Sequence, residues 1–283
     1  MKRNFKYIFV LILLAVAVIS WREAFGRDRD KLKFYMLDVG QGDAIFIETP
    51  SGNQILFDGG QDRKILEELG KVMPFYDRSI DLVILTHPHL DHAGGLLEVL
   101  KNYEVGELMD GGDSYNLAEY GELKKLMEEK KIKYEVARRG LKISLDKGIS
   151  LLVLAPDKLI KSDNPHDNNV VSRLSYGRID FLLMGDGEKG EELKLVQAGD
   201  NLESEVLKVG HHGSKTSSNP LFLEEVNPEY ALISVGAKNR YGHPAQITLD
   251  NLLAAGAKIL RTDIDSIIEF KTDGDSLTLV GEK

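Results

Sequence analysis

Short apolar runs alternate with amphipathic stretches along most of this chain. Runs rich in β-branched and aromatic residues, bounded by Gly, Pro, Asn or Asp, have the length and pattern of strands. They cover residues 33–39, 44–49, 53–58, 79–86, 149–156, 204–210, 230–236, 257–262, 266–270 and 276–280, and residues 169–186 form two strands joined at Tyr176-Gly177-Arg178. The pattern therefore predicts strands along nearly the whole length of the chain.

Other segments repeat their apolar residues at the spacing of an amphipathic helix. The clearest is 117–131, with Leu117 and Leu123 on one side and Glu and Lys on the other. Asn219 followed by Pro220 has the pattern of a helix start. Helices are predicted over residues 63–72, 96–103, 117–131, 219–226 and 249–256. Because helices interrupt blocks of strands, we expect an α/β fold in which helices cover two sheets.

The first thirty residues have a different pattern. Lys2, Arg3 and Lys6 precede a run without charge from Tyr7 to Trp21. A basic start, an apolar run and a polar exit are typical of a signal peptide or an N-terminal signal anchor. The run is shorter than the roughly 20 residues that comfortably span a bilayer. We favour an uncleaved transmembrane anchor, with a cleaved signal peptide and a secreted protein as the alternative.

The basic flank also predicts the orientation of the chain. Positively charged residues stay on the cytoplasmic side of a membrane segment, so the remainder of the chain should lie outside the cytoplasmic membrane. The expected organisation is a signal anchor and short linker over residues 1–30 and one domain over residues 31–283. The protein would then be a single-pass protein of the cell membrane with an extracytoplasmic domain.

Composition narrows the chemistry that is available. The chain contains no cysteine, which excludes disulfides and metal sites built on thiolates. Its formal net charge is −9, whereas a protein that coats nucleic acid over a broad face is usually basic. A local cationic groove beside a metal centre remains open, because a bound metal is the strongest positive charge in its surroundings.

Three of the chain's seven histidines stand in the segment THPHLDHAGG, directly after a predicted strand. In the loop that leaves this strand, His87 and His89 can turn to one side and share a metal ion. Asp91 and His92 can then face a second metal ion. Nitrogen and oxygen ligands without sulfur suit Zn²⁺, Mn²⁺ or Fe. The segment therefore predicts a metal centre.

Further ligands are available at the ends of other predicted strands. Asp186 follows one strand of the buried type, His211 follows another, and His166 precedes a third. Binding sites collect a few polar groups from several elements in one cleft. We expect these three residues to join the histidine-rich loop.

Together these motifs resemble the metallo-β-lactamase fold superfamily, which has HxHxDH after a strand, FDGG upstream, GD downstream and a later His at a strand end. The match is closer to one branch, the hydrolase domain of ComEC-type competence proteins. The segments that carry it are LDVGQGDAIFIETPSGNQILFDGG, LTHPHLDHAGG, LLMGDGE, LKVGHHGSKTSSNP and ISVGAKNRYGHP. The resemblance runs from about Lys33 to Lys283 and implies an αββα four-layer sandwich with metals at one edge.

The resemblance also implies a ligand set for two divalent metal ions, Zn²⁺ or Mn²⁺. The first would be held by His87, His89 and a third group, the second by Asp91, His92 and His211, with Asp186 as the bridge. Asp58 is similar to the aspartate that orients the histidine loop in this superfamily. That role agrees with the tendency of ligand imidazoles to donate their second N–H to a carboxylate or carbonyl.

The family pattern is ambiguous for the third ligand of the first metal. Many ComEC-type relatives have Asp in place of the second His of HxHxDH, and an Asn-rich stretch where other members have a ligand His. This chain has His89, and it has both His166 and the pair Asn168-Asn169. His166 is our candidate for the third ligand, and a loop histidine that binds no metal is the alternative.

Two later loops carry groups that suit a phosphate. The substrate-binding candidates are His212, Ser214, Lys215, Asn239 and Arg240. The first three precede a predicted helix start, and helix N-termini favour anions. Tyr241 would add a stacking ring and His243 a proton donor, while Asp91 or Asp186 would hold the attacking water. Each has a structural alternative, since Ser/Thr loops often cap helices and a His-Pro pair often makes a turn.

The segment Gly40-Gln41-Gly42-Asp43 reads as a tight turn near the rim of the cleft, with a structural and a functional role equally open. Our first hypothesis for the protein is a metal-dependent phosphodiesterase, a nuclease that cleaves DNA with a two-metal-activated water. The second is another hydrolase of this fold, acting on a lactone, thioester or β-lactam. The third is a non-catalytic DNA-handling module stabilised by its metal.

One departure from the family bears on the partners. ComEC-type channels carry many membrane spans, and this sequence has at most one. The expected partners are DNA or another phosphodiester substrate, the membrane, and a separate DNA channel protein. Degradation of external nucleic acid without a channel is the alternative role.

Overall fold

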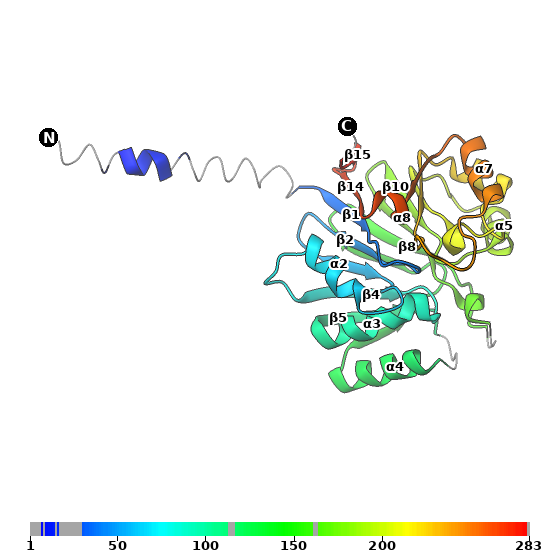
Figure 1. Ribbon diagram of the computed structural model, residues 1–283, viewed down its shortest axis with the longest axis horizontal. Coiled ribbons are helices and arrows are strands. Elements are labelled where there is room, and N and C mark those ends of the chain that lie inside the picture. Colours follow the sequence, from blue (N-terminus) through cyan, green and yellow to red (C-terminus); the bar gives the residue numbers. More distant parts are fainter. Residues whose placement is uncertain are drawn as a thin grey trace.

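Two β-sheets pack face to face in this computed structural model, and helices cover the outer face of each sheet (Figure 1). The structure describes residues 7, 9–14, 16, 30–112, 117–160 and 164–281. The arrangement agrees with the α/β fold of two helix-covered sheets that the sequence predicts. It also has the layer order, helix–sheet–sheet–helix, that the family resemblance implied.

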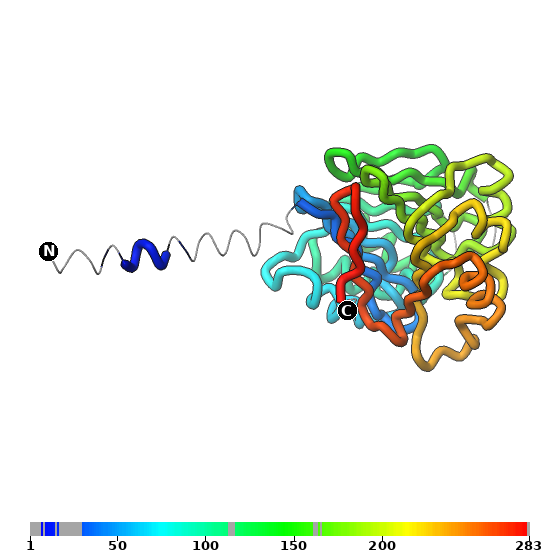
Figure 2. Tube along the Cα trace, turned by 90° about the horizontal axis from the view of Figure 1, so that it is seen from above, coloured from blue at the N-terminus to red at the C-terminus, as the bar shows by residue number. Residues whose placement is uncertain are grey.

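The first sheet combines strands from the two ends of the folded chain. Its order is β15 (Leu277–Leu279), β14 (Ile268–Thr272), β1 (Leu32–Met36), β2 (Ile45–Glu48), β3 (Gln54–Phe57), β4 (Ser79–Leu85), β5 (Glu104–Asp110) and β6 (Lys133–Val136). Figure 2 shows the red strands β14 and β15 beside the blue β1. β14 pairs antiparallel with β1, so the last strands complete the sheet that the first strands begin.

The second sheet comes from the second half of the chain. Its order is β13 (Lys258–Arg261), β12 (Tyr230–Ile233), β11 (Val206–Lys208), β10 (Ile179–Leu183), β9 (Val171–Tyr176), β8 (Ile149–Ala155) and β7 (Lys142–Asp146). The strands from β10 to β13 are parallel, and β7 to β10 are antiparallel. Parallel strands are connected through helices that run back along the sheet face, which places all their carboxyl ends at one edge.

Successive side chains of a strand point to opposite faces of its sheet, so one strand contributes to two hydrophobic cores. In β1, Phe34 and Met36 enter the core between the sheets, whereas Tyr35 packs toward the helices. Phe34 stacks on Phe181 of β10 with 4.7 Å between ring centroids, so the two sheets meet through aromatic contact. Both faces of such strands are buried, which explains why they read as continuous apolar runs.

The helices lie in two outer layers. Over the first sheet lie α2 (Lys64–Val72), α3 (Leu90–Asn102) and α4 (Ala118–Lys130), and over the second lie α5 (Lys189–Ala198), α6 (Pro220–Val226) and α7 (Gln246–Ala254). Asn219 caps α6 as predicted, since its side chain accepts a hydrogen bond from the Leu221 N–H. The short elements are η1 (Pro165–Asn168), η2 (Gly210–Gly213) and α8 (Thr262–Asp265).

Helix α3 begins six residues earlier than the predicted start at Leu96. Gly94 and Gly95 lie inside it and do not precede it. A Cβ on Gly95 would lie 1.9 Å from the Gly59 carbonyl oxygen, so the glycines allow this helix to pack directly on the loop after β3. Asp91 and His92 are therefore fixed on the first helical turn.

The described part of the chain also contains β5, β6, β7 and α5, which the apolar pattern did not predict. The first half of β5 contains two glutamates and Gly106, and β6 has two exposed residues at its start. In α5 only Glu192 and Leu195 are fully buried, and Glu191 is partly buried, so its sequence has little helical amphipathicity. Tertiary packing outweighs weak local preference in these elements.

Most of the predicted N-terminal anchor, residues 1–6, 8, 15 and 17–29, lies outside the described residues. Tyr7, residues 9–14 and Val16 are helical. Within the part of the chain that the structure describes, no helix has the length and apolar character needed to cross a membrane. The transmembrane anchor therefore remains a prediction.

Candidate metal centre

The predicted metal ligands meet at the edge where the strands of both sheets end. Asp58 follows β3, His87 follows β4, Asp186 follows β10 and His212 follows β11. We call this side the carboxyl edge, and the opposite side, where β1, β3, β4 and β5 begin, the amino edge. Each sheet supplies about half of the ligands, so the site exists only when the two sheets are packed together.

Asp58 fixes the conformation of the histidine-rich loop. Its carboxylate accepts hydrogen bonds from the Thr86 N–H at 2.8 Å, the Thr86 hydroxyl at 2.7 Å and the His92 Nδ1 at 2.8 Å. Because the Nδ1 of His92 donates to this carboxylate, its Nε2 presents a lone pair to the site. This is the geometry expected of the aspartate that orients the loop.

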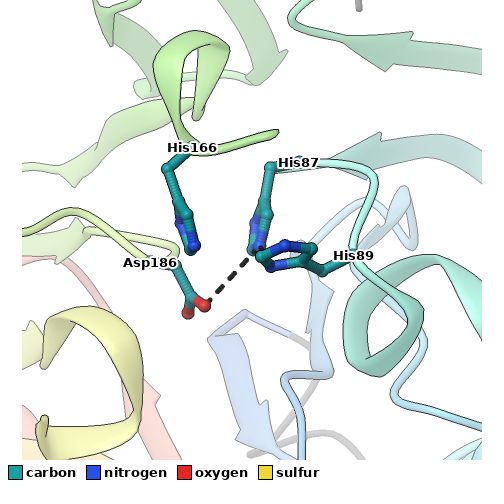
Figure 3. A group of neighbouring side chains, drawn as sticks. All are labelled: His87, His89, His166 and Asp186. Carbon is teal, nitrogen blue, oxygen red and sulfur yellow. Dashed lines mark hydrogen bonds and ion pairs between the residues drawn. The ribbon is translucent and has the colours of Figure 1, made fainter. Parts of the chain in front are cut away.

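The first group of potential ligands consists of His87, His89, His166 and Asp186 (Figure 3). One donor atom from each lies within 4.8 Å of the others. The His87 Nε2 is 2.9 Å from the His89 Nδ1 and 3.5 Å from the Asp186 Oδ2. His166 is carried by η1 and stacks on His87 with 4.9 Å between ring centroids. The structure therefore places His166 where a third histidine ligand would stand.

The second group consists of Asp91, His92 and His212. The His212 Nε2 lies 3.3 Å from the Asp91 Oδ2. On the other side of the ring, the His212 Nδ1 donates to the Ser234 carbonyl oxygen at 3.0 Å, which turns Nε2 toward the site. Both imidazoles of this group are thus oriented by a hydrogen bond that their far nitrogen donates, one to a carboxylate and one to a carbonyl oxygen.

Asp186 lies between the two groups. Its Oδ2 faces His87, and its Oδ1 is 3.4 Å from the His92 Nε2 and 3.5 Å from the His212 Nε2. The Asn169 side-chain oxygen accepts the Asp186 N–H at 3.1 Å, and a Cβ on Gly185 would lie 2.3 Å from that oxygen. The glycine therefore allows the close contact that holds Asp186 in place.

The structure differs from the resemblance in the histidine that joins the second group. We expected His211, but His212 lies beside Asp91 and His92. Both histidines have left-handed backbone angles, with φ of 48° and 51°, which sends their side chains in different directions. The His211 Nδ1 lies 3.0 Å from Glu188, and its Nε2 is 3.9 Å from the Asp186 Oδ2. His211 therefore lies at the rim of the site.

The electrostatic surroundings of the two groups are opposite. Burial, together with the neighbouring imidazoles, lowers the pKa of His87 and lowers that of His89 to about 4. Burial alone would also lower the pKa of His92 and His212, but Asp186 outweighs it and, with Asp43, raises the pKa of His212 to about 10. The first group thus offers neutral imidazoles, and the second is rich in negative charge.

Three buried atoms show that a cation fits between the groups. His92 Nε2, His212 Nε2 and Asp186 Oδ1 have no hydrogen-bond partner among the described residues. Buried polar atoms are normally paired, and these three face one another at 3.4 and 3.5 Å. Imidazole and carboxylate donors without sulfur are suited to Zn²⁺, Mn²⁺ or Fe.

Two residues at the site were missed by the sequence analysis. Asp43, in the segment interpreted as a rim turn, is 2% exposed, and its Oδ1 lies 3.3 Å from the His212 Nδ1. Lys208, which is 1% exposed, forms an ion pair with Asp43 and donates to the Gly185 carbonyl oxygen at 2.7 Å. An ionisable residue in the middle of an apolar strand is the signal that could have identified Lys208.

Hydrogen bonds through Asn169 connect Asp186 with helix α5. Asn169 is fully buried, and its Nδ2 donates to the Met184 carbonyl oxygen and to Glu191, each at 2.9 Å. Its oxygen accepts the Asp186 N–H, so the amide is satisfied on both sides. Asn169, which we had considered only as part of an Asn-rich stretch, therefore positions Asp186.

An open cleft of about 250 Å³ reaches the metal centre. It is lined by Gln41, His89, Leu90, Asp91, Asp186, His211, His212, Tyr241 and His243. Tyr241 is 67% exposed and stacks on His243 with 5.8 Å between ring centroids. The structure thus brings Tyr241 and His243 to the metal edge, as the sequence analysis expected.

Of the five substrate-binding candidates only His212 lines this cleft, and it stands there among the potential metal ligands. Ser214 is buried, and its hydroxyl pairs with the Thr216 hydroxyl at 2.9 Å. Asn239 bonds to the backbone of His243 through both its oxygen and its nitrogen, so it holds the turn together. Lys215 and Arg240 are exposed. Their proposed contact with substrate remains untested by this geometry.

Comparison with known proteins identifies the family to which the chain belongs. Residues 37–237 match the model of the Metallo-beta-lactamase superfamily. The chain is 30% identical over 253 residues to "ComE operon protein 3" of Bacillus subtilis, covering 83% of this chain and 32% of that protein. It is also 30% identical over 265 residues to "Competence protein ComA" of Neisseria gonorrhoeae, covering 92% and 35%. The chain therefore spans about a third of the length of these relatives.

A solved structure shows the same fold. The metallo-beta-lactamase fold protein YhfI from Bacillus subtilis superposes with a TM-score of 0.58, covering 86% of this chain and all of that one. The sequences are 13% identical, so this likeness concerns the fold alone. It agrees with the two packed sheets and the helices that cover them.

Proposed function

The chain belongs to the metallo-beta-lactamase superfamily and is related to ComEC-type competence proteins, and from that premise we propose that it is a membrane-anchored phosphodiesterase that cleaves DNA. The observation that carries the proposal is the position of Asp186. One of its oxygens faces the first group of ligands and the other faces the second. A carboxylate shared in this way supports a centre for two metal ions, which is a common arrangement in phosphodiester hydrolysis.

The residues present define which groups would hold each ion. His87, His89 and His166 would hold one, Asp91, His92 and His212 the other, and Asp186 would contact both. The ions would lower the pKa of a bound water and neutralise charge on a phosphate oxygen. Two carboxylates act beside them: Asp186 as the shared ligand, and Asp91 at the cleft wall.

Asp91 and His243 are the residues proposed to handle protons. Asp91 lines the cleft, and although burial raises its pKa, the His212 and His92 imidazoles beside it outweigh burial and keep the pKa well below its usual value. Its carboxylate therefore stays ionised and can accept a hydrogen bond from the attacking water. Burial and the neighbouring His211 lower the pKa of His243, so it is neutral at pH 7 in the free protein. A bound phosphate would favour its protonated form, which is the form that donates to a leaving oxygen.

DNA is the proposed substrate because of the relatives and the cleft. Relatives carry the names "Competence protein ComA" and "Recombination protein 2", which connect this branch with the handling of DNA. The cleft ends at an exposed tyrosine ring, Tyr241, on which a base could stack. Lys215 and Arg240 are exposed on neighbouring loops and could contact the phosphate backbone.

The location and partners belong to the same proposal. The basic start and the apolar run to Trp21 support a single-pass anchor with the metal centre outside the cytoplasmic membrane. A separate DNA channel protein would then be the partner in uptake. Without such a partner, the enzyme would degrade external nucleic acid.

The test uses the full-length protein in detergent, stripped with a chelator and reloaded with Mn²⁺ or Zn²⁺. Labelled single- and double-stranded DNA, bis(p-nitrophenyl) phosphate and a chromogenic β-lactam are offered as substrates. We expect metal-dependent cleavage of DNA and of the model phosphodiester. Asp186→Ala should bring cleavage to background, because both ions lose a ligand.

The other outcomes separate the alternatives. Turnover of the β-lactam with intact DNA would support a different hydrolase of this fold. Tight metal binding without turnover of any substrate would support a structural metal in a DNA-handling module. Cleavage that persists in Asp186→Ala would point to a contaminating nuclease and would remove the support for this proposal.

A further inference from the structure

Two aromatic side chains project from the loop between α2 and β4. Phe75 is 86% exposed and Tyr76 is 76% exposed, and their rings pack edge to face with 5.4 Å between centroids. Pro74 precedes them and is also exposed. Adjacent aromatic residues with so little burial are costly to leave in water, so they indicate a surface that is covered by something else.

This aromatic pair stands at the amino edge, close to the point where the N-terminal segment joins the folded domain. The N-terminal end of β1 pairs with the end of β2, and β3 and β4 begin in the same row. Gln54 at the start of β3 donates to Asp77, which directly follows the aromatic pair. Figures 1 and 2 both show the loop between α2 and β4 on the side of the molecule where β1 begins.

The length of the linker keeps this edge near the apolar N-terminal run. Residues 22–31 separate Trp21, the last residue of that run, from Leu32, the first of β1. A fully extended chain covers at most about 3.6 Å per residue, so Leu32 stays within roughly 40 Å of Trp21. If the run lies in a bilayer, the amino edge is the part of the domain that is held beside its surface.

We propose that Phe75 and Tyr76 insert into the lipid interface of the membrane that holds the N-terminal anchor. This inference rests on the proposed anchoring, and it is independent of the proposed nuclease activity. Aromatic rings with an apolar body and a polar tip concentrate at the level of the lipid headgroups, and Tyr76 has that character. Docking through the amino edge directs the metal cleft, at the opposite edge, away from the bilayer.

Charge at this edge is mixed. Helices α2, α3 and α4 all end there, and their last turns carry Lys71, Lys101 and Lys130. Cations near the surface are attracted to anionic lipids. Glutamates pair with the first two lysines, and Asp77 and Glu104 stand at the same edge. The aromatic pair therefore supplies the main contact.

The experiment places a tryptophan at the proposed contact and measures its quenching by lipid. The only tryptophan of the chain, Trp21, is first replaced by Trp21→Phe in the full-length protein. Phe75→Trp then reports on the loop, and Ile264→Trp is the matched control. Ile264 is 67% exposed in α8, which follows the carboxyl end of β13 and so lies at the opposite edge. The vesicles contain phosphatidylglycerol and phosphatidylethanolamine, with or without bromine on the acyl chains.

We expect both variants to float with the vesicles. Bromine should remove roughly half of the emission of Phe75→Trp, because an interfacial side chain reaches the acyl boundary, and it should leave Ile264→Trp almost unchanged. Flotation with an unquenched Phe75→Trp would overturn the inference and leave the anchoring proposal intact. If the protein is absent from the floating fraction, both the anchoring and the docking are overturned. The proposed DNA cleavage is measured in a separate assay and is not affected by this outcome.

Discussion

The two groups of candidate metal ligands differ in how firmly the protein holds them. In the second group, His92 and His212 are almost fully buried, and Asp58 and the Ser234 carbonyl fix the far nitrogen of each ring. In the first group, His89 and His166 are partly exposed and are placed by a loop and a short 3-10 helix. His212 itself stands in the short element η2, so the difference between the groups lies in burial and in the hydrogen bond on the far nitrogen of each ring.

This difference has a consequence for metal binding. Ligands whose orientation is fixed before binding lose little conformational entropy when the metal arrives. Asp58, Asp186 and Asp43 lie beside these two imidazoles, and their carboxylates also attract a cation to that position. We therefore expect the second group to bind its ion more tightly than the first, and the following substitutions test that ranking.

The largest effect should come from His212→Ala, with His211→Ala as the matched control. Removing His212 takes a ligand from the second group and leaves Asp43 without its imidazole neighbour. We expect the loss of one metal ion per chain and a fall in activity beyond the roughly 100-fold that the loss of an outer partner costs. His211→Ala should keep both ions. The metal content of both variants is measured by mass spectrometry. An equal loss of metal in both variants would contradict the assignment of His212 as a ligand.

A smaller effect is expected from Asp58→Asn, which changes the tautomer of one ligand. The amide nitrogen of asparagine would donate to the His92 Nδ1, so the proton of that ring would move to Nε2, the atom that should bind metal. We expect a 10- to 100-fold loss of affinity for one of the two ions. Titration with Zn²⁺ against a competing chelator measures both affinities. Unchanged affinity at both sites would show that Asp58 does not control the ring.

His166→Ala should have a weaker effect than either of these. The first group would keep His87, His89 and Asp186, and the second group would remain complete. We expect the weaker-binding ion to be lost at low metal concentration and recovered, with most of the activity, when Mn²⁺ is added in excess. If the metal content and the concentration of Mn²⁺ needed for activity stay at the wild-type values, His166 is a loop histidine without a metal.

The smallest effect concerns the support behind Asp186. Burial raises the pKa of Glu191 in the folded protein to about 7, from an ordinary value of 4.5. The unfolded chain therefore loses this proton at lower pH than the folded chain, and the contribution of Glu191 to stability declines as the pH rises from about 4.5 to 7. Glu191→Gln keeps an acceptor for Asn169 and does not ionise.

We expect the melting temperature of Glu191→Gln, relative to wild type, to increase between pH 5 and pH 8. Because the two melting temperatures are compared at the same pH, the effects of all other titrating groups cancel in their difference. A constant difference over this range would show that Glu191 is ionised in the folded state at pH 5. Glu225→Gln, at an exposed position of α6, is a control for the effect of removing one negative charge from the surface.

The sequence predicted the fold well where strands have both faces buried. Segments such as 79–86 and 230–236 read as continuous apolar runs, and they became β4 and β12. It failed where an element has one solvated face or little amphipathicity, as in β5 and α5. It also placed the start of α3 too late, because the glycines that allow close packing on Gly59 look like helix breakers in the sequence.

The site was predictable to the level of ligand types and strand ends. The choice between His211 and His212 was not, because adjacent residues differ only in the direction that the backbone gives their side chains. Asp43 was missed for a related reason. A Gly-rich segment predicts a turn, and only the packing of that turn against His212 and Lys208 reveals a buried carboxylate.

The pairing of β14 with β1 has a consequence for the order in which the protein can be completed. β1 is made first, yet the strand on one of its sides comes from residues 268–272. Phe270 of that strand also packs against Phe181, with 6.4 Å between ring centroids. During synthesis, one edge of β1 stays unpaired, and the core beneath it stays incomplete, until almost all of the remaining chain has been made. Contacts between residues so distant in sequence form slowly. If export proceeds from the N-terminus, this unpaired edge crosses the membrane long before its partner, and it is there that a holding chaperone would be needed.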